Sequence, residues 1–325
     1  MEIIEKKQFF EITTAFEVVP HTQAEGWCEM FTSEDESRIV FFVDDKEVPM
    51  IACMAHIKQF LGKKLLLIEG ECLKNKNITA SQIKDFYNEI RKSSFDFIEI
   101  SSSLPYSADY EIGIRQAGYL RPAGLFSTSL SILVNLSQEI EYDKNWRKNL
   151  RRTEKNALLF NPILLPSQKD FEDYIAIHQA MSKRKQFVDY LTLTQLLKLF
   201  SENGFYLFFV EDNLGVRIAG MILYVHKGIA TLVYSATSKK GREYSASYLL
   251  YAKIFTFLKE EKGVLLVDMG RISPAAHKKN DIFLFKNGVR GTYIQYNGEW
   301  SWYKYSFYRP LMYFVKKHLF KRIEV

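Results

Sequence analysis

The clearest pattern of apolar and polar positions lies between residues 205 and 291. Three apolar runs come first, and the polar pairs Asp212-Asn213 and Lys227-Gly228 separate them as hairpin turns do. The predicted strands are Phe205–Val210, Ile218–Val225 and Ile229–Ser235. A helix is predicted from about Arg242 to Glu261, because apolar residues recur there every three or four positions.

A short apolar strand is predicted directly after this helix. Gly263 ends the helix, and the wholly apolar run Val264–Val267 is typical of a buried central strand. Asp268-Met269-Gly270-Arg271 follows at the carboxyl end of that strand, where ligands tend to bind in open α/β sheets. The stretch that ends in Phe285-Lys286-Asn287-Gly288 is interpreted as a loop.

The first 135 residues show a similar order of elements. The predicted strands are Arg38–Val43, Met50–Ile57, Lys64–Glu69, Phe95–Ile100 and Ser127–Leu136. One helix is predicted to begin at an N-cap, Thr79, and a second to cover Tyr106–Ala117 and end at Gly118. The chain therefore reads as two copies of one fold, with domains at residues 1–140 and 141–325.

Composition narrows the class of protein. A chain of 325 residues with 47% hydrophobic and 25% charged residues is typical of a soluble globular protein of two domains. The formal charge of +6 fits an anionic partner such as a nucleotide, phosphate, RNA or membrane surface, although many proteins without such a partner carry as much. Three cysteines without metal-ligand spacing predict free thiols and no metal site. Since no apolar run reaches the ~20 residues that span a bilayer, and no signal segment is present, we expect a cytoplasmic protein.

The sharpest electrostatic feature is a basic helix that Asp143 can cap. Its cations recur at three- and four-residue steps and are Lys144, Arg147, Lys148, Arg151, Arg152 and Lys155. Trp146, Leu150 and Ala157 lie elsewhere on the predicted helix and can be buried, and only Glu154 offsets the charge. The segment is either a solvated surface helix or a helix that faces a phosphate group.

The order of four segments resembles the acyltransferase core of the GNAT superfamily, and more specifically its FemAB-like branch of bacterial peptidoglycan bridge ligases. These segments are Ile229–Thr237, Arg242–Leu250, Leu266–Gly270 and Leu284–Gly291. The resemblance implies an α/β (α+β) fold of two tandem GNAT-like domains. Each would be a mixed, mostly antiparallel sheet flanked by helices, with the active site in the second domain.

The resemblance also implies a site for the acyl donor. In GNAT proteins, backbone amides at the turn into the long helix hold the pyrophosphate of acyl-CoA. The matching residues here are Arg242, Tyr244, Ser245 and Ser247. Both serines stand where the family has Gly or Ala, which counts against acetyl-CoA as the donor. FemAB-like ligases, which use aminoacyl-tRNA, are also degenerate at this turn.

The remaining candidates concern the acceptor and the reaction. The resemblance places Lys286 near the reacting carbonyl, where an ammonium stabilises an oxyanion, and Asp268 is the second catalytic candidate. The substrate-binding candidates are Arg147, Lys148, Arg151, Arg152, Arg271 and Tyr234. The sequence shows no partner for His56, His178, His226 or His277, and none is assigned as a general base.

Together these residues predict an N-acyltransferase or aminoacyltransferase. It would move an activated acyl group to an amine acceptor that bears phosphate, such as a cell-wall precursor or another phosphorylated metabolite. No tightly bound cofactor is expected. Acyl-CoA or aminoacyl-tRNA would be the co-substrate, so tRNA is a partner if the donor is aminoacyl-tRNA, and DNA is not an expected partner. The alternative, kept open by the lack of a recognisable general base, is a non-catalytic GNAT-fold protein that binds an anionic nucleotide-linked ligand.

Overall fold

The computed structural model describes residues 1–32, 38–60, 62–123, 129–186, 191–274 and 281–318. The chain forms two compact units, and each unit is built from separate stretches of sequence. Unit 1 comprises residues 1–24, 34–130 and 294–325, and unit 2 comprises residues 25–33 and 131–293. Unlike the predicted domains 1–140 and 141–325, these units are discontinuous, and the boundary at residue 140 stays a prediction.

Unit 1 is a mixed sheet with helices packed against it. Its strands are β1 (Glu2–Ile4), β2 (Ile39–Val43), β3 (Ile51–Phe60), β4 (Lys63–Ile68), β5 (Cys72–Leu73), β6 (Phe97–Pro105) and β13 (Thr292–Tyr303). Its helices are α1 (Lys6–Thr14), the 3-10 turn η1 (His21–Gln23), α3 (Ala80–Arg91), α4 (Ala108–Gln116) and α11 (Tyr308–His318). The strand order is β1-β2-β3-β4-β6-β13 with β5 beside β3, and β4 and β6 are parallel. The predicted N-cap is confirmed, because Thr79 and Gln82 form a reciprocal capping box at the start of α3.

Unit 2 has the same kind of sheet. Its strands are β7 (Leu130–Asn135), β8 (Leu159–Ile163), β9 (Phe205–Glu211), β10 (Arg217–His226), β11 (Ile229–Thr237) and β12 (Leu266–Asp268). Its helices are α2 (Glu25–Thr32), α5 (Lys144–Lys155), α6 (Gln168–Lys185), α7 (Leu193–Leu199), α8 (Lys239–Glu243), α9 (Ala246–Lys262) and α10 (Asp281–Asn287). The strand order is β7-β12-β11-β10-β9-β8, with β11 and β12 parallel.

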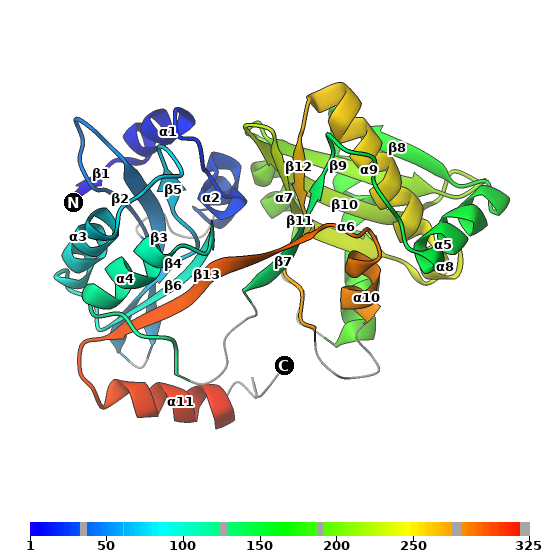
Figure 1. The fold of residues 1–325 in the computed structure, drawn as a ribbon. Helices are drawn as coiled ribbons and strands as arrows, with labels where there is room; N and C mark the ends of the chain where they lie inside the picture. The colour runs from blue at the N-terminus through cyan, green and yellow to red at the C-terminus, as the bar shows by residue number, and fades with distance from the viewer. Residues whose placement is uncertain (33–37, 61, 124–128, 187–190, 275–280, 319–325) are drawn as a thin grey trace. The chain divides into compact units, whose positions relative to one another are not determined.

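The two units repeat one order of elements and exchange their last strands. In unit 1, α3 links the parallel strands β4 and β6, and α4 follows; in unit 2, α9 links β11 and β12, and α10 follows. The strand after α4 is β7, which pairs with β12 of unit 2, whereas the strand after α10 is β13, which pairs with β6 of unit 1. Figure 1 shows the exchange as an orange β13 among the blue and cyan strands of unit 1. The prediction of two tandem α/β copies is confirmed.

Both faces of the unit 2 sheet are covered. Successive strand residues point to opposite faces, yet every residue from Ile218 to Tyr224 of β10 is buried. Helices α6 and α9 both pack against β10, and α9 contributes Leu250, Ile254 and Leu258 to the core. This central layer fixes the position of β11 beside β12.

Three local predictions differ from the structure. The helix expected from Arg242 is broken, because Ser245 adopts a left-handed conformation (φ 63°) between α8 and α9. The stretch interpreted as a loop contains α10, which is too short to show a helical period. Ala157 lies beyond the end of α5 with φ 48° and is exposed.

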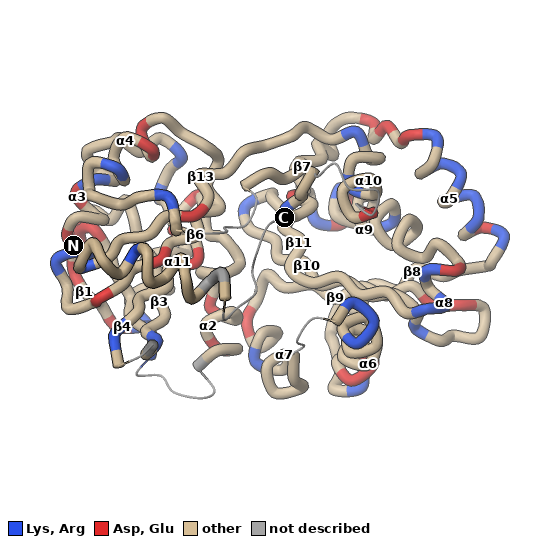
Figure 2. The backbone as a smooth tube through the Cα atoms, turned by 90° about the horizontal axis from the view of Figure 1, so that it is seen from below, with Lys and Arg blue, Asp and Glu red and all other residues tan. Residues whose placement is uncertain are grey.

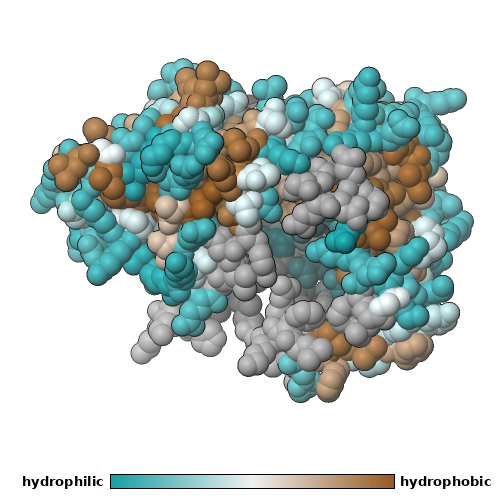
Figure 3. Space-filling view, turned by 180° about the vertical axis from the view of Figure 1, so that it is seen from behind, coloured by the Kyte–Doolittle hydropathy of each residue, from teal (hydrophilic) through white to brown (hydrophobic). Residues whose placement is uncertain are grey.

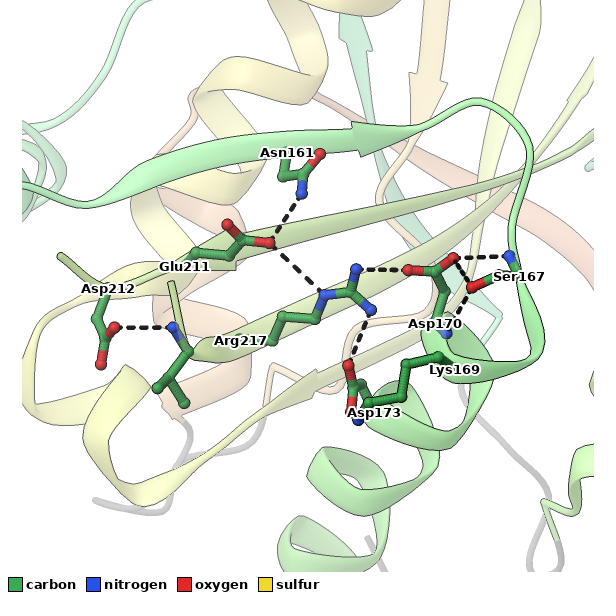
Figure 4. A network of polar contacts seen from close by, with 9 residues as sticks. Asn161, Ser167, Lys169, Asp170, Asp173, Glu211, Asp212 and Arg217 are labelled. Atoms are coloured by element: carbon green, nitrogen blue, oxygen red, sulfur yellow. Dashed lines mark hydrogen bonds and ion pairs between the residues drawn. The ribbon is translucent and has the colours of Figure 1, made fainter. Parts of the chain in front are cut away.

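A charged network ties the first turn of α6 to β9 and β10 (Figure 4). The guanidinium of Arg217 bonds to Asp170, lies 3.0 Å from Asp173 and 3.6 Å from Glu211, and covers the ring of Phe209. Burial acts to raise the pKa of Asp170, but hydrogen bonds from Ser167 and Arg217 outweigh it and hold that pKa below its usual value. Ionised Asp170 therefore stabilises the fold above about pH 4, and this contribution is lost as the pH falls through the lowered pKa.

We predict that Arg217→Met lowers the free energy of unfolding by about 2–4 kcal/mol at neutral pH, because it leaves three carboxylates close together without their cation. The difference between parent and variant should shrink as Asp170 becomes protonated, below about pH 4. Urea unfolding at several pH values measures both effects. Lys169→Met, which removes an exposed partner of Asp173, is the control and should change stability by less than about 0.5 kcal/mol. A pH-independent loss in Arg217→Met would contradict the electrostatic explanation.

Candidate functional site

The candidate site lies where β11 runs on past the end of β12. The two strands pair in parallel from Ile229↔Leu266 to Thr231↔Asp268, where β12 ends, whereas β11 continues to Thr237. Among the described strands, none pairs with this continuing edge of β11, and its side chains from Leu232 to Ser235 are only partly buried. This is the carboxyl end of the parallel pair, the position at which open α/β sheets bind ligands.

Asp268 shapes the turn that follows β12. Its Oδ1 accepts hydrogen bonds from the hydroxyl of Ser131 and from the backbone N–H of Gly270, at 2.8 Å. Gly270 has φ 75°, a conformation that favours glycine, and an added Cβ would lie 3.4 Å from Nζ of Lys286. The turn therefore brings two backbone carbonyls and one carboxylate to the end of the strand.

Lys286 reaches this turn from α10. Its amine donates to the carbonyl oxygens of Gly270 at 3.1 Å and Arg271 at 3.0 Å. The residue is only 7% exposed, so the amine lies in a buried environment. Burial lowers the pKa of Lys286 to about 8, and the negative charge of Asp268 opposes that shift. The amine is therefore largely protonated at pH 7, and two of the three N–H bonds of the ammonium are used by carbonyls.

An aromatic cluster holds α10 in place. The indole N–H of Trp146 in α5 donates to the carbonyl of Phe285 at 2.6 Å, and the ring of Tyr248 lies 4.9 Å from both aromatic rings. Asp143 caps α5 at the N–H of Trp146, and its own N–H donates to the carbonyl of Gly288. A Cβ on Gly288 would lie 2.2 Å from Cδ1 of Trp146. The residues on either side of Lys286 are thus fixed by the start of α5.

Basic residues recur along the predicted helix, as the blue segments of α5 in Figure 2 show. The predicted substrate-binding residues of this helix, Arg147, Lys148, Arg151 and Arg152, are all exposed. Arg152 also lies 3.5 Å from the carbonyl oxygen of Glu243 in α8. The end of α5 therefore approaches the turn that leads into α9.

The predicted donor residues gather at that turn. The hydroxyl of Ser245 donates to Asn149 of α5 at 3.1 Å, and Ser247 shares a hydrogen bond of 2.8 Å with Thr237. Arg242 lies against the carbonyls that precede α8, and the amine of Lys240 lies 5.4 Å from the ring centre of Tyr244. The first N–H groups of α9 have no carbonyl partner within the helix and form its positive end.

Sequence reasoning missed two further cations near this turn. Arg184 and Lys185 lie in the last turn of α6, close to Arg242 of α8. Partial exclusion of water and the neighbouring guanidinium groups lower the pKa of Lys185, and Arg242 is affected in the same way. Like charges held this close favour a bound anion. The run Lys183-Arg184-Lys185 was the signal available in the sequence.

The structure thus forms two groups of candidates, Asp268, Arg271 and Lys286 at the end of β12 and the donor residues at the start of α9. Tyr234 of β11 belongs to a third group, with ring centres 6.2 Å from Trp27 and 6.0 Å from His178. His277 lies outside the described residues. Within the part of the chain that the structure describes, no cluster of His, Cys, Asp and Glu side chains could hold a metal ion. In that same part, no helix has the length and apolar character needed to cross a bilayer.

We predict that Gly288→Ala destabilises the protein by about 1–3 kcal/mol, because the added methyl group must displace the ring of Trp146. Thermal unfolding and the tryptophan emission spectrum measure the change. Ile282→Ala, at an exposed position of the same helix, is the matched control and should change stability by less than about 0.5 kcal/mol. Equal stability of Gly288→Ala and the parent would contradict the tight contact.

Comparison with solved structures shows which known proteins share the fold of this chain. No family model matches the sequence, and no curated protein matches it. Among solved structures, FemX superposes with a TM-score of 0.74 at 11% identity, over 96% of this chain and 100% of FemX. L-PGS from Bacillus licheniformis gives 0.61 at 14% identity, over 94% and 99% of the two chains. The C-terminal domain of an Agrobacterium fabrum protein assigned as a lysylphosphatidylglycerol synthetase gives 0.62 at 12% identity, over 95% of each chain. The chain therefore has the same fold as these proteins.

Proposed function

We propose that the protein is an N-acyltransferase that transfers an activated acyl group, most simply an aminoacyl group, to an amine acceptor. The observation that carries the proposal is the buried amine of Lys286 at the end of β12, beside Asp268. The shared fold with FemX and with an assigned lysylphosphatidylglycerol synthetase supports the aminoacyl transfer, since the second name denotes attachment of lysine to a lipid. The acceptor would be a phosphate-bearing cell-wall or lipid precursor.

The reaction is a direct attack of the acceptor amine on the acyl carbon. A C–N bond forms, the ester or thioester bond breaks, and the amine proton leaves with the departing alkoxide or thiolate. Negative charge develops on the carbonyl oxygen in the tetrahedral intermediate. The ammonium of Lys286 would stabilise this oxygen with the N–H that Gly270 and Arg271 do not use. Asp268 supports that geometry by fixing the turn on which both carbonyls lie.

The donor would place its phosphate groups at the start of α9. Arg242, Arg184 and Lys185 supply cations there, and the free N–H groups of the first turn add a positive end. We favour aminoacyl-tRNA over acyl-CoA because the side chains of Ser245 and Ser247 occupy the turn that holds the pyrophosphate of acyl-CoA in GNAT proteins. Both side chains are fixed there by hydrogen bonds to Asn149 and Thr237. The exposed cations of α5 would extend the contact along an RNA backbone.

We predict that Lys286→Met lowers kcat by roughly a hundredfold or more, because one donor to the oxyanion is lost. The assay follows from a screen of acyl-CoAs and aminoacyl-tRNAs against amine acceptors. The kcat of the parent should also fall as the pH rises through about 8, because Lys286 loses its proton there. Lys286→Arg, which stays protonated, should lack this fall and retain more activity than Lys286→Met. A kcat that instead rises through pH 8 only when Lys286 is present would make the neutral amine a base.

We predict that the double change Lys185→Gln/Arg242→Gln raises KM for the donor by roughly tenfold or more and changes kcat little, since these cations bind donor phosphates in ground state and transition state alike. The matched control is Lys253→Gln/Lys259→Gln, which removes two exposed cations from α9 itself. If both double variants raised KM equally, a general charge effect would replace the proposed anion site.

The second candidate is a non-catalytic protein that binds an anionic, nucleotide-linked ligand. One observation favours it: two backbone carbonyls already occupy the amine of Lys286. Native mass spectrometry of freshly purified protein would identify a ligand that co-purifies. Binding of such a ligand without turnover across the whole donor screen would favour this candidate over the acyltransferase.

A further inference from the structure

The segment from Lys304 to His318, which follows β13 and contains α11, has an unusual composition. It includes the aromatic residues Tyr305, Phe307, Tyr308, Tyr313 and Phe314. Its charged residues are Lys304, Arg309, Lys316 and Lys317, and it contains no Asp or Glu. An aromatic and basic segment without acids is the composition of helices that lie at membrane surfaces.

Helix α11 and the preceding residue, Phe307, carry two apolar stripes. Tyr308, Met312 and Val315 are buried, and the first two pack with Phe97 of unit 1. One position earlier along the chain, Phe307, Leu311 and Phe314 repeat the same spacing but are 60%, 40% and 57% exposed. The first stripe attaches the helix to unit 1, so the second stripe is left facing solvent. Figure 3 shows one face of the molecule, on which brown hydrophobic groups lie among teal hydrophilic ones.

The surroundings of the exposed stripe are positively charged. Lys304 and Arg309 are exposed, and Lys64 at the start of β4 is exposed as well. The neighbouring Lys63 hydrogen-bonds to Tyr308 of α11, which places these lysines beside the helix. One nearby acid, Asp96, is half-buried and accepts a hydrogen bond from the backbone N–H of Lys64. Lys63, Lys64, Lys304 and Arg309 therefore place four cations on or beside α11.

We propose that α11 is a membrane-surface anchor that docks unit 1 on bilayers containing anionic phospholipids. The helix would lie in the plane of the interface, with Phe307, Leu311 and Phe314 among the acyl chains and the lysines at the phosphates. Its 11 residues span about 16 Å, too short to cross the ~30 Å hydrocarbon core. The inference is independent of the proposed function, since Lys286 belongs to unit 2.

Charge decides between lipid and a second copy of the chain. A two-fold dimer through this face would set the face against itself and bring cation to cation. Anionic phospholipid headgroups supply the opposite charge, and the acyl chains accept the aromatic side chains. The observations therefore favour a lipid surface as the occupant.

The test is flotation of the full chain with vesicles of phosphatidylcholine alone and of phosphatidylcholine mixed with phosphatidylglycerol. The parent should float with the mixed vesicles, less at high salt and less with phosphatidylcholine alone. The triple change Phe307→Ser/Leu311→Ser/Phe314→Ser should lower partitioning roughly tenfold or more. Lys64→Gln/Lys304→Gln should lower it roughly tenfold on the mixed vesicles only.

The matched control removes three exposed apolar residues of unit 2, as Leu164→Ser/Leu165→Ser/Leu214→Ser, and should bind like the parent. Lys286→Met should also bind like the parent, which separates this test from that of the proposed function. The proposal is overturned if the parent ignores mixed vesicles, or if the α11 triple variant binds as well as the control triple. It is also overturned if the parent does not bind vesicles and light scattering shows that the parent is a dimer and the α11 triple variant a monomer.

Discussion

The hydrogen bond from the indole of Trp146 to the carbonyl of Phe285 is the constraint on which the candidate site depends. It fixes α10 to the start of α5, and α10 alone brings Lys286 to the end of β12. The contact tolerates no side chain at residue 288, so Gly288 is a steric requirement of the packing. Aromatic rings from α5, α9 and α10 pack around this partly buried bond, and their apolar surroundings strengthen it.

Helix α5 connects the two groups of candidate residues. Trp146 and Asn149 are three residues apart and share one face, and they reach Phe285 and Ser245 respectively. The other face exposes the cations. Helix α5 therefore has a second role besides its charged surface, because it contacts both the segment that carries Lys286 and the start of α9.

Sequence patterns predicted what is local. The hairpins of β9, β10 and β11 and the cap at Thr79 follow from neighbouring residues, and the aromatic, lysine and glycine positions of 285–288 led to Lys286 as a candidate. The burial of Lys286 was missed because its carbonyl partners lie fifteen and sixteen residues away, at Arg271 and Gly270. The break at Ser245 was missed because no glycine marks the left-handed position, and the partner of the Ser245 hydroxyl, Asn149, lies far along the chain. The strand exchange was missed because the sequences of β7 and β13 do not indicate which of the two sheets each strand joins.

That exchange has a consequence for how the protein is made. The N-terminus of the chain emerges from the ribosome first. The sheet of unit 1 is therefore complete only after β13, at residues 292–303, has been synthesised. Until then β6 presents an unpaired edge, and helix α2 has no unit 2 to join. The last strand of unit 2, β12, is synthesised before β13. Unit 2 can therefore complete its sheet, with β12 paired to β7, while the edge of β6 is still unpaired. The N-terminal half of the sequence therefore finishes folding last, and the nascent chain is most exposed to mispairing during the synthesis of residues 131–293.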